Sequence, residues 1–296
     1  MLDLTIRNKG IGGSEVAAIL GLDEYSSPYK VWLSKTGRES SNVDNKYTQA
    51  GIILEDAVSK FFESKTDYRI IKASAKSETL IHPKYPFAFG TPDRRYFRST
   101  SVGKGILECK TTQHAYDDVP QKWFIQLQWY LGIVGYNFGS VAWLERGLDF
   151  KYKEFEYDPQ FFEYLVQAAE RFWTENVVKD VPPEAIDVND IQLMYRKHTD
   201  GVVVEASEEM AAAYEELVRV RTAIKTLDEE KNKLEDAIKF TMREAESVMS
   251  KGKPLFTWKS SKASTKFDVD SFKADHPDLF SAYLKEIEGS RRFLVK

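Results

Sequence analysis

Apolar and polar residues along the first 180 positions fall into short runs separated by turn-forming residues. Five of these runs predict β-strands, because apolar, aromatic and β-branched residues concentrate in each over the length of a strand. The predicted strands cover residues 69–75, 90–97, 106–111, 139–146 and 150–157. We therefore expect a β-sheet in the central part of the chain.

Between and around these strands, apolar residues recur at three- and four-residue spacing, which predicts helices packed on the sheet. Proline at the first helical position and glycine after the last one supply the end signals. The predicted helices run over 14–21, 28–37, 49–62, 120–134 and 159–173. A mixed sheet flanked by helices is an α/β (α+β) architecture, and Val181-Pro182-Pro183 ends this domain.

From about Ser207 to Val248 the apolar positions change to a heptad spacing, with Lys231 as a polar break and charges at most other positions. The heptad positions are Met210, Ala213, Leu217, Val220, Ile224, Leu227, Leu234, Ile238 and Thr241. This pattern is typical of a coiled coil. The seam could pair between chains, fold back as a hairpin or pack on the first domain.

The remaining tail mixes short strands at 255–259 and 292–295 with a helix at 270–286. The domain organisation predicted from these patterns has four parts. They are an α/β domain at 1–183, a linker at 184–206, a long helical segment at 207–250 and a small α/β appendage at 251–296.

The strongest chemical signal is Thr91-Pro92-Asp93 followed by Glu108-Cys109-Lys110. Side chains alternate between the two faces of a strand, so Glu108 and Lys110 point one way and Cys109 the other. With Asp93 on the neighbouring strand, two carboxylates and an ammonium converge. Carboxylate oxygens suit Mg²⁺ or Mn²⁺, and a nearby lysine can orient a water or stabilise developing charge. Taken alone, the same residues are compatible with solvated charges on half-exposed strands.

Two helices add polar residues to this site. Glu55 lies at the edge of the apolar side of its helix, where a helix that meets the sheet can lend a carboxylate. Gln126 and Tyr130 lie one turn apart on the helix at 120–134 and so share a face. That pair can hold a nucleotide or brace the lysine, or it can serve helix–sheet packing.

A third feature is the segment Gly12-Gly13-Ser14 before an amphipathic helix. Ser14 is expected to cap this helix, and free amides at a helix N-terminus attract anions. Arg7 lies close by in sequence. The alternative is an ordinary capped helix.

Composition limits the possible classes of function. One cysteine excludes a disulfide framework and a four-cysteine iron–sulfur cluster, and the four histidines lack zinc-site spacing. The net charge is −4, but residues 1–150 carry +2 and the remainder −6. Near the acidic residues lie four cations that could contact phosphates or be solvated: Arg94, Arg95, Arg98 and Lys104. The chain shows no signal peptide pattern or long apolar segment, so a cytoplasmic protein that does not enter membranes is expected.

Together these motifs resemble the YqaJ-like viral recombinase family, relatives of the lambda exonuclease within the PD-(D/E)XK nuclease superfamily. Six ordered motifs over roughly the first 180 residues carry the resemblance. They lie at 11–21, 27–37, 51–55, 91–93, 107–112 and 126–130, with His82-Pro83 and Phe172-Trp173 as further matches. The resemblance implies a restriction-endonuclease-like core and metal-dependent hydrolysis of DNA from a 5′ end.

By the same resemblance, Asp93 and Glu108 would be Mg²⁺ or Mn²⁺ ligands, and the Cys109 carbonyl could add another. Lys110 would serve the attacking water, while Glu55 would complete the acidic site. Separately, Gln126 would position the substrate or support the site. Arg7 and Ser14 would bind the DNA 5′-phosphate.

The resemblance also implies three kinds of partner: double-stranded DNA ends, a single-strand annealing recombination protein, and further copies of the chain, since relatives of lambda exonuclease form trimeric rings. A phage or prophage origin in a bacterial host is expected. The alternatives are an endonuclease of the same superfamily, a DNA-end-binding recombination module without cleavage, and a structural coiled-coil adaptor. The intact acidic positions and lysine disfavour the last two.

Overall fold

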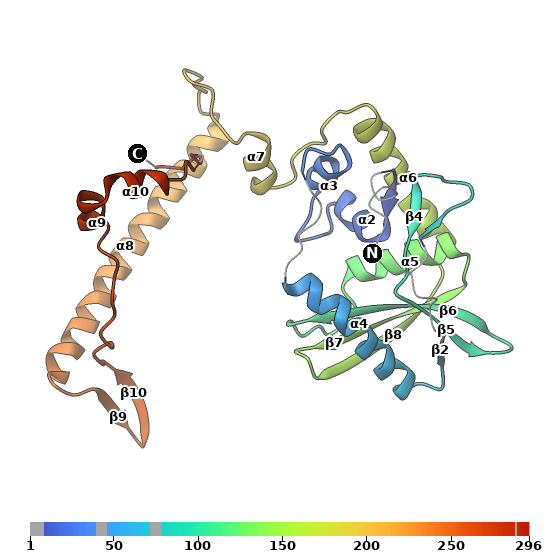
Figure 1. Ribbon diagram of the computed structural model, residues 1–296, viewed down its shortest axis with the longest axis horizontal. Helices are drawn as coiled ribbons and strands as arrows, with labels where there is room; N and C mark the ends of the chain where they lie inside the picture. Colours follow the sequence, from blue (N-terminus) through green and yellow to red (C-terminus); the bar gives the residue numbers. More distant parts are fainter. Residues whose placement is uncertain (1–8, 40–45, 72–78, 288, 296) are drawn as a thin grey trace. The chain divides into compact units, whose positions relative to one another are not determined.

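The computed structural model describes residues 9–39, 46–71, 79–287 and 289–295 (Figure 1). The chain divides into two units, residues 1–195 and 196–296. Each unit is described by itself. None of the helices in the described part of the chain has both the length and the apolar character needed to cross a membrane.

The first unit is built on a five-stranded sheet with the order β2-β5-β6-β7-β8. Its strands are β2 (Arg69–Ile71), β5 (Arg94–Ser99), β6 (Gly103–Thr112), β7 (Phe138–Glu145) and β8 (Asp149–Glu156). Strands β6 and β7 are parallel and the other neighbours are antiparallel. Every residue of β7 is buried, as expected for a strand covered on both faces. The mixed sheet flanked by helices confirms the predicted fold class.

Helices cover both faces of this sheet and divide the core into two clusters. On one face, α5 (Gln121–Val134) and α6 (Pro159–Phe172) pack over Ile106 and Val141. On the other face, α4 (Lys46–Lys65) packs over Leu107 and Cys109. Successive residues of β6 therefore belong to opposite clusters, in agreement with the alternation of a strand. Figure 1 shows β6 between its neighbours in the middle of the sheet.

The strand predicted at 90–97 is wrong as a single element. Residues Ala88–Gly90 form β4, which pairs in a separate three-stranded sheet with β1 (Ile11–Gly12) and β3 (Leu80–Ile81). Strand β5 begins only at Arg94. Pro92 lies between the two strands, and proline has no N–H for a ladder. Asp93 consequently lies at a strand junction and not inside a strand.

The helix ends follow the predicted signals with one correction. Ser27 caps α3 (Pro28–Lys35) and Asp158 caps α6, both through their side chains. The N-cap of α2 (Gly13–Ile19), however, is Gly12 and not Ser14. The Gly12 amide donates to Glu15 Oε2 at 2.8 Å, so a glutamate one turn into the helix supplies the oxygen expected from serine.

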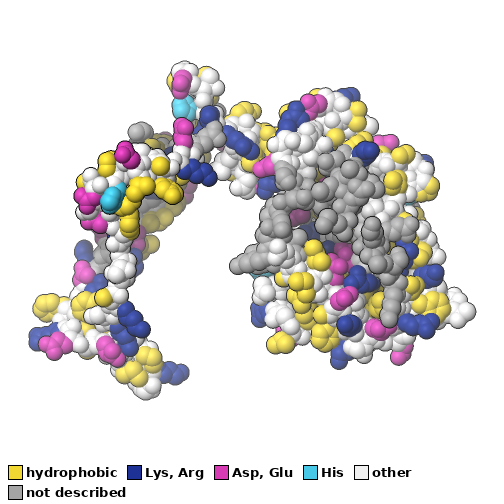
Figure 2. Space-filling model, viewed as in Figure 1, with side chains coloured by type: hydrophobic (Ala, Val, Ile, Leu, Met, Phe, Trp, Pro, Cys, Tyr) yellow, Lys and Arg dark blue, Asp and Glu magenta, His cyan; other side chains and the backbone are white. Residues whose placement is uncertain are grey.

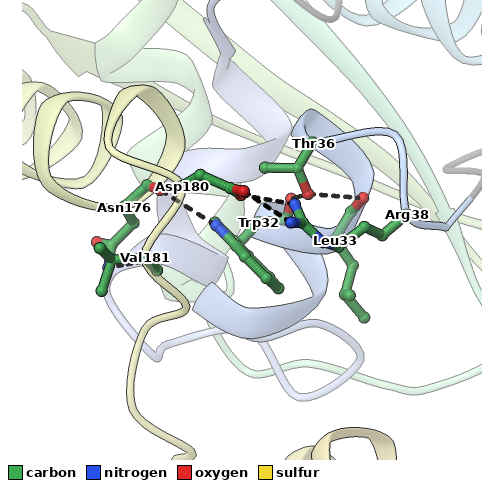
Figure 3. A network of polar contacts seen from close by, with 7 residues as sticks. All are labelled: Trp32, Leu33, Thr36, Arg38, Asn176, Asp180 and Val181. Carbon is green, nitrogen blue, oxygen red and sulfur yellow. Dashed lines mark hydrogen bonds and ion pairs between the residues drawn. The ribbon is translucent and has the colours of Figure 1, made fainter.

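An arginine clamp joins α3 to the segment after α6, which is a π-helical stretch, η1 (Trp173–Val178) (Figure 3). Arg38 donates to both carboxylate oxygens of Asp180, at 2.6 and 2.8 Å, and its guanidinium lies 4.4 Å from the centre of the Trp32 ring. Trp32 in turn donates from Nε1 to the Asn176 carbonyl. Bidentate pairing and ring stacking both exploit the planar guanidinium.

A further helix, α7 (Val188–Met194), lies within the segment predicted to be a linker. Asp190 on α7 is fully buried. It accepts hydrogen bonds from Ser27 Oγ at 2.5 Å and from the Ile186 amide at 3.1 Å. This aspartate connects α7 to the start of α3.

The second unit contains one uninterrupted 35-residue helix, α8 (Glu208–Met242), capped by Ser207. Its continuity is incompatible with a hairpin, and almost all of its seam positions are exposed. A β-hairpin follows, β9 (Ser247–Ser250) and β10 (Lys253–Thr257). The helix predicted at 270–286 is instead two short ones, α9 (Val269–Asp275) and α10 (Pro277–Ala282), since proline starts a new helix. The strand predicted at 292–295 is wrong, because these residues have no strand structure.

Glu145 at the end of β7 holds the loop that follows β6. Its carboxylate accepts hydrogen bonds from Trp143 Nε1 at 2.8 Å, from the Tyr116 amide at 2.9 Å and from Lys151 Nζ at 3.1 Å. Lys151 also donates to the Tyr116 carbonyl. The hydrogen bond from Trp143, followed by that from Tyr116, lowers the pKa of Glu145 to about 2.

Replacing Glu145 by glutamine tests this network, because it keeps an acceptor but removes the charge. A carboxylate whose folded-state pKa is lowered stabilises the fold above its unfolded pKa, roughly 4.3, and loses this stabilisation as pH falls toward the folded value. We expect wild type to melt above Glu145→Gln at neutral pH, and the difference to shrink as pH falls from about 4.3 toward 2. Calorimetry at several pH values measures this difference in melting temperature. A difference that does not change with pH would contradict the lowered pKa of Glu145.

Candidate active site

Asp93 and Glu108 meet at the junction between β4, β5 and β6. Arg94 pairs with Leu107 in the antiparallel ladder, which puts the preceding Asp93 beside the following Glu108. The Cys109 amide donates to Asp93 Oδ2 at 2.8 Å and holds this carboxylate against β6. The two predicted acidic residues are therefore brought together.

Glu108 is a fully buried carboxylate. Its Oε1 lies 2.7 Å from Lys110 Nζ, whereas Oε2 is buried and has no hydrogen-bond partner among the described residues. A buried oxygen without a partner is costly. Burial, reinforced by the nearby Asp93 carboxylate, raises the pKa of Glu108 to about 8.

Lys110 is held by two residues. Besides Glu108, its ammonium donates to Gln126 Oε1 at 2.9 Å, and Gln126 Nε2 donates to Tyr130 Oη at 3.1 Å. Burial works to lower the pKa of Lys110, but the carboxylates of Glu108 and Asp93 outweigh it and the net shift is upward. The lysine thus stays charged. Of the roles proposed for Gln126 and Tyr130, the contacts match bracing of the lysine.

Two glycines allow Tyr130 to reach this position. A Cβ on Gly13 would lie 2.6 Å from Tyr130 Cε1, and a Cβ on Gly90 would lie 2.8 Å from Tyr130 Cδ1. Both distances are well inside van der Waals contact, so the ring fits only because α2 and β4 carry no side chain there. The glycines that begin α2 therefore have a packing role next to the site.

Glu55 approaches the site from α4. Its Oε2 lies 3.8 Å from an Arg94 guanidinium nitrogen, and the same arginine donates to Asp56 at 2.5 Å. Burial and then the charge of Asp93 raise the pKa of Glu55 to about 7. Arg94, one of the cations considered for phosphate contact, is thus engaged with carboxylates of α4.

The donor set fits a divalent cation. Burial also raises the pKa of Asp93, so three neighbouring carboxyl groups resist ionisation together. A bound cation would remove that resistance, and Glu108 Oε2 is a buried hard ligand without a partner. Among the described residues, however, no three His, Cys, Asp or Glu side chains stand close enough to hold a metal ion as they are arranged here.

The other residues predicted for the site are Cys109, Ser14 and Arg7. The Cys109 side chain is buried in the cluster under α4, on the face opposite Glu108 and Lys110, as the alternation predicted. Ser14 is exposed in the first turn of α2, and Arg7 lies outside the described residues. Sequence reasoning missed the Glu145 network and the contacts of Gly13 and Gly90. Glycine inside a strand was a usable signal for the latter.

Comparison with known protein sequences identifies the family of this chain. The model of the YqaJ-like viral recombinase domain matches residues 4–137. The protein YqaJ of Bacillus subtilis (strain 168) is 30% identical over 306 residues, which cover 98% of this chain and 92% of that protein. The chain belongs to the YqaJ-like viral recombinase family.

Solved exonuclease structures show a weaker similarity. An alkaline exonuclease, LHK-Exo from Laribacter hongkongensis, has a TM-score of 0.46 and 13% identity over 60% of this chain and 92% of that one. A phage related exonuclease from Haemophilus somnus 129PT has a TM-score of 0.44 and 13% identity over 60% of this chain and 99% of that one.

The packing around Tyr130 can be tested with Gly13→Ala. We expect a loss of about 1–3 kcal/mol of unfolding free energy, the usual cost of overpacking, because the new methyl group collides with the ring. Gly51→Ala is the matched control, since Gly51 is also helical and a Cβ there meets nothing within 4 Å; it should stabilise by about 0.5–1 kcal/mol. Urea unfolding followed by fluorescence measures both. Equal effects of the two substitutions would contradict the close contact.

Proposed function

We propose that this protein is a metal-dependent deoxyribonuclease that hydrolyses linear duplex DNA from its ends. One set of contacts carries the proposal: Lys110 Nζ lies 2.7 Å from Glu108 Oε1 and 2.9 Å from Gln126 Oε1, next to Asp93. Phosphodiester hydrolysis needs an oriented water and compensation of negative charge on the phosphate. Two carboxylates and a held ammonium supply these elements. Membership in a viral recombinase family supports the proposal.

Lys110 acts as a charged donor. An ammonium has three N–H groups, and Glu108 and Gln126 accept two of them among the described residues. The third is available to the attacking water or to a phosphate oxygen. Because the neighbouring carboxylates raise its pKa, the lysine stabilises developing negative charge more readily than it accepts a proton.

Asp93 and Glu108 are the proposed ligands of Mg²⁺ or Mn²⁺, with the Cys109 carbonyl as a possible additional ligand. When bound, such an ion supplies positive charge beside the phosphate and acidifies the attacking water. Glu55 adds an outer carboxylate from α4. Gln126, held by Tyr130, keeps Lys110 in place through the reaction.

We further propose that cleavage runs 5′→3′ and leaves 3′ overhangs. Arg7 and Ser14 are the proposed contacts of the DNA 5′-phosphate. Ser14 is exposed in the first turn of α2, where backbone amides point toward an approaching anion. Glu15 in the same turn is paired with Lys35 at 2.7 Å, so its charge is offset.

A 3′ overhang is the substrate of a single-strand annealing protein, and such a protein is the proposed partner. The exposed seam of α8 is a surface that could bind it or pair copies of this chain, including a ring of three.

The polarity of cleavage is tested with linear duplex DNA labelled at either the 5′ or the 3′ end. In Mg²⁺, the 5′ label should be released first as mononucleotides, and closed circular DNA should survive. Release of the 3′ label first would reverse the proposed direction, and cutting of closed circles would indicate an endonuclease.

In the same assay, Lys110→Ala should slow single-turnover cleavage by about 10²–10⁴-fold, the contribution of a positioned proton-transfer or charge-stabilising group. Cys109→Ser is the matched control on the same strand, since its side chain faces the opposite cluster. It should keep most of the rate. Equal losses in both variants would contradict the assignment of faces on β6.

Metal binding can be measured without cleavage. Mg²⁺ should raise the melting temperature of the wild type, by the equivalent of about 2.7 kcal/mol when free Mg²⁺ is about 100-fold above its Kd. Glu108→Gln should respond little, because it removes the charged ligand but keeps the shape of the side chain. The same response to Mg²⁺ in both proteins would exclude Glu108 as a ligand.

A further inference from the structure

A basic segment follows α8. Residues 247–267 contain five lysines and no aspartate or glutamate. The remaining residues of the second unit contain 14 lysines and arginines against 19 acidic residues. Positive charge is therefore concentrated in one stretch of an otherwise acidic unit. The five lysines are Lys251, Lys253, Lys259, Lys262 and Lys266.

The same segment presents aromatic side chains to solvent. Every residue from 249 to 270 is exposed. Phe256, Trp258 and Phe267 have exposed fractions of 42%, 49% and 64%. Figure 2 shows lysine and arginine side chains at the lower left, around the hairpin labelled β9 and β10 in Figure 1, with hydrophobic and some acidic side chains among them. Exposed apolar patches rimmed by polar residues are typical of interaction sites.

The hairpin of β9 and β10 determines where several of these lysines and aromatic residues lie. Strands β9 and β10 are antiparallel, and Lys251 and Gly252 at the tip both have positive φ, 47° and 75°, as two-residue hairpin turns require. At the base, the Trp258 amide donates to the Glu246 carbonyl at 2.9 Å and Lys259 pairs with the Glu246 side chain at 3.2 Å. The backbone of Trp258 is held while half of its side chain stays open to solvent.

We propose that residues 247–267 bind single-stranded DNA. Lysines offset backbone phosphates, and exposed aromatic rings stack on unpaired bases. A duplex would use the lysines but not the rings, because its bases are already stacked on one another. The choice of DNA over RNA rests on the proposed nuclease function, whereas the recognition of phosphates and unpaired bases does not. The segment would retain the single strand that cleavage exposes.

Binding is measured with full-length protein in EDTA, which stops metal-dependent cleavage, by titrating single-stranded oligothymidine at several salt concentrations. Changing all five lysines to glutamine should weaken binding and flatten its salt dependence. Each phosphate contact on a single strand contributes about 0.7 to the slope of log K against log salt, so five contacts contribute up to about 3.5. Blunt duplex of equal length should also lose affinity, because its phosphates contact the same lysines.

The control variant changes five cations of α8 to glutamine and so alters net charge equally. These residues are Arg221, Lys225, Lys231, Lys233 and Lys239. They lie among acidic residues, as in the pairs of Lys231 with Asp228 and Lys239 with Glu235. The control should keep the wild-type slope and affinity.

Trp258 supplies a separate spectroscopic readout, since the other five tryptophans are buried or half-buried. Oligothymidine should quench the fluorescence of the wild type. Trp258→Phe should lose most of the quenching but keep most of the affinity. Trp258→Ala should lose roughly 5- to 150-fold in affinity for oligothymidine, the range for one stacked base, and less for blunt duplex.

Several results would overturn the proposal. One is an unchanged salt slope in the five-lysine variant, or an equal loss in the α8 control. Another is a loss of duplex affinity in Trp258→Ala as large as the loss for single strand, because a ring that stacks on unpaired bases should not affect the duplex equally. Tighter binding of oligouridine than of oligothymidine would reject DNA as the ligand. Absence of cleavage in Mg²⁺ alongside lysine-dependent binding in EDTA would reject the proposed nuclease function but keep this one.

Discussion

The site depends on a carboxylate that the fold buries completely. Glu108 lies on the central strand of the sheet, where no water solvates it, and its charge is balanced by Lys110 on the same face of the same strand. A buried ion pair is stable only if the remaining donors and acceptors are satisfied. On the side of the lysine, Gln126 accepts a second hydrogen bond and itself donates to Tyr130. On the side of the glutamate, the Oε2 atom of Glu108 has no hydrogen-bond partner among the described residues.

The unpartnered Oε2 of Glu108 belongs to a group of carboxyl groups with perturbed pKa values. Burial raises the pKa of Asp93 and of Glu108, and the Asp93 carboxylate adds to the effect on Glu108. Burial and then Asp93 also raise the pKa of Glu55, whereas Arg94 lowers it. Perturbed titratable groups that lie together mark candidate functional sites, and the proposed metal binding rests on these carboxyl groups.

The two faces of β6 carry different side chains, polar site residues on one face and packing residues on the other. Along β6, Leu107 and Cys109 face the cluster under α4, while Glu108 and Lys110 face α5. A shift of one residue in register would exchange the two sets and bury the charges in the hydrophobic cluster. The pairing of β6 with β5 on one side and β7 on the other fixes that register. Among the described residues of the second unit, only Met242 on α8 is a buried hydrophobic residue.

The sequence by itself determined the local features. Alternation on β6 predicted which of Glu108, Cys109 and Lys110 share a face, because side-chain direction in a strand depends only on position. Proline at the first helical position predicted the starts of α3 and α6, where Ser27 and Asp158 cap the helices through their side chains. The heptad pattern likewise indicated a long helix. All of these are properties of neighbouring residues.

Only the tertiary structure decided which distant residues meet. It placed Gly12 and not Ser14 at the N-cap of α2, and the Gly12 amide donates to Glu15, whose carboxylate also pairs with Lys35 from another helix. It also fitted Tyr130 between Gly13 and Gly90, which lie far apart in sequence. It paired Arg94 with α4, and it left the Glu108 oxygen without a partner. Contacts of this kind depend on how separate elements pack against one another. The residue pattern within one segment does not encode that packing.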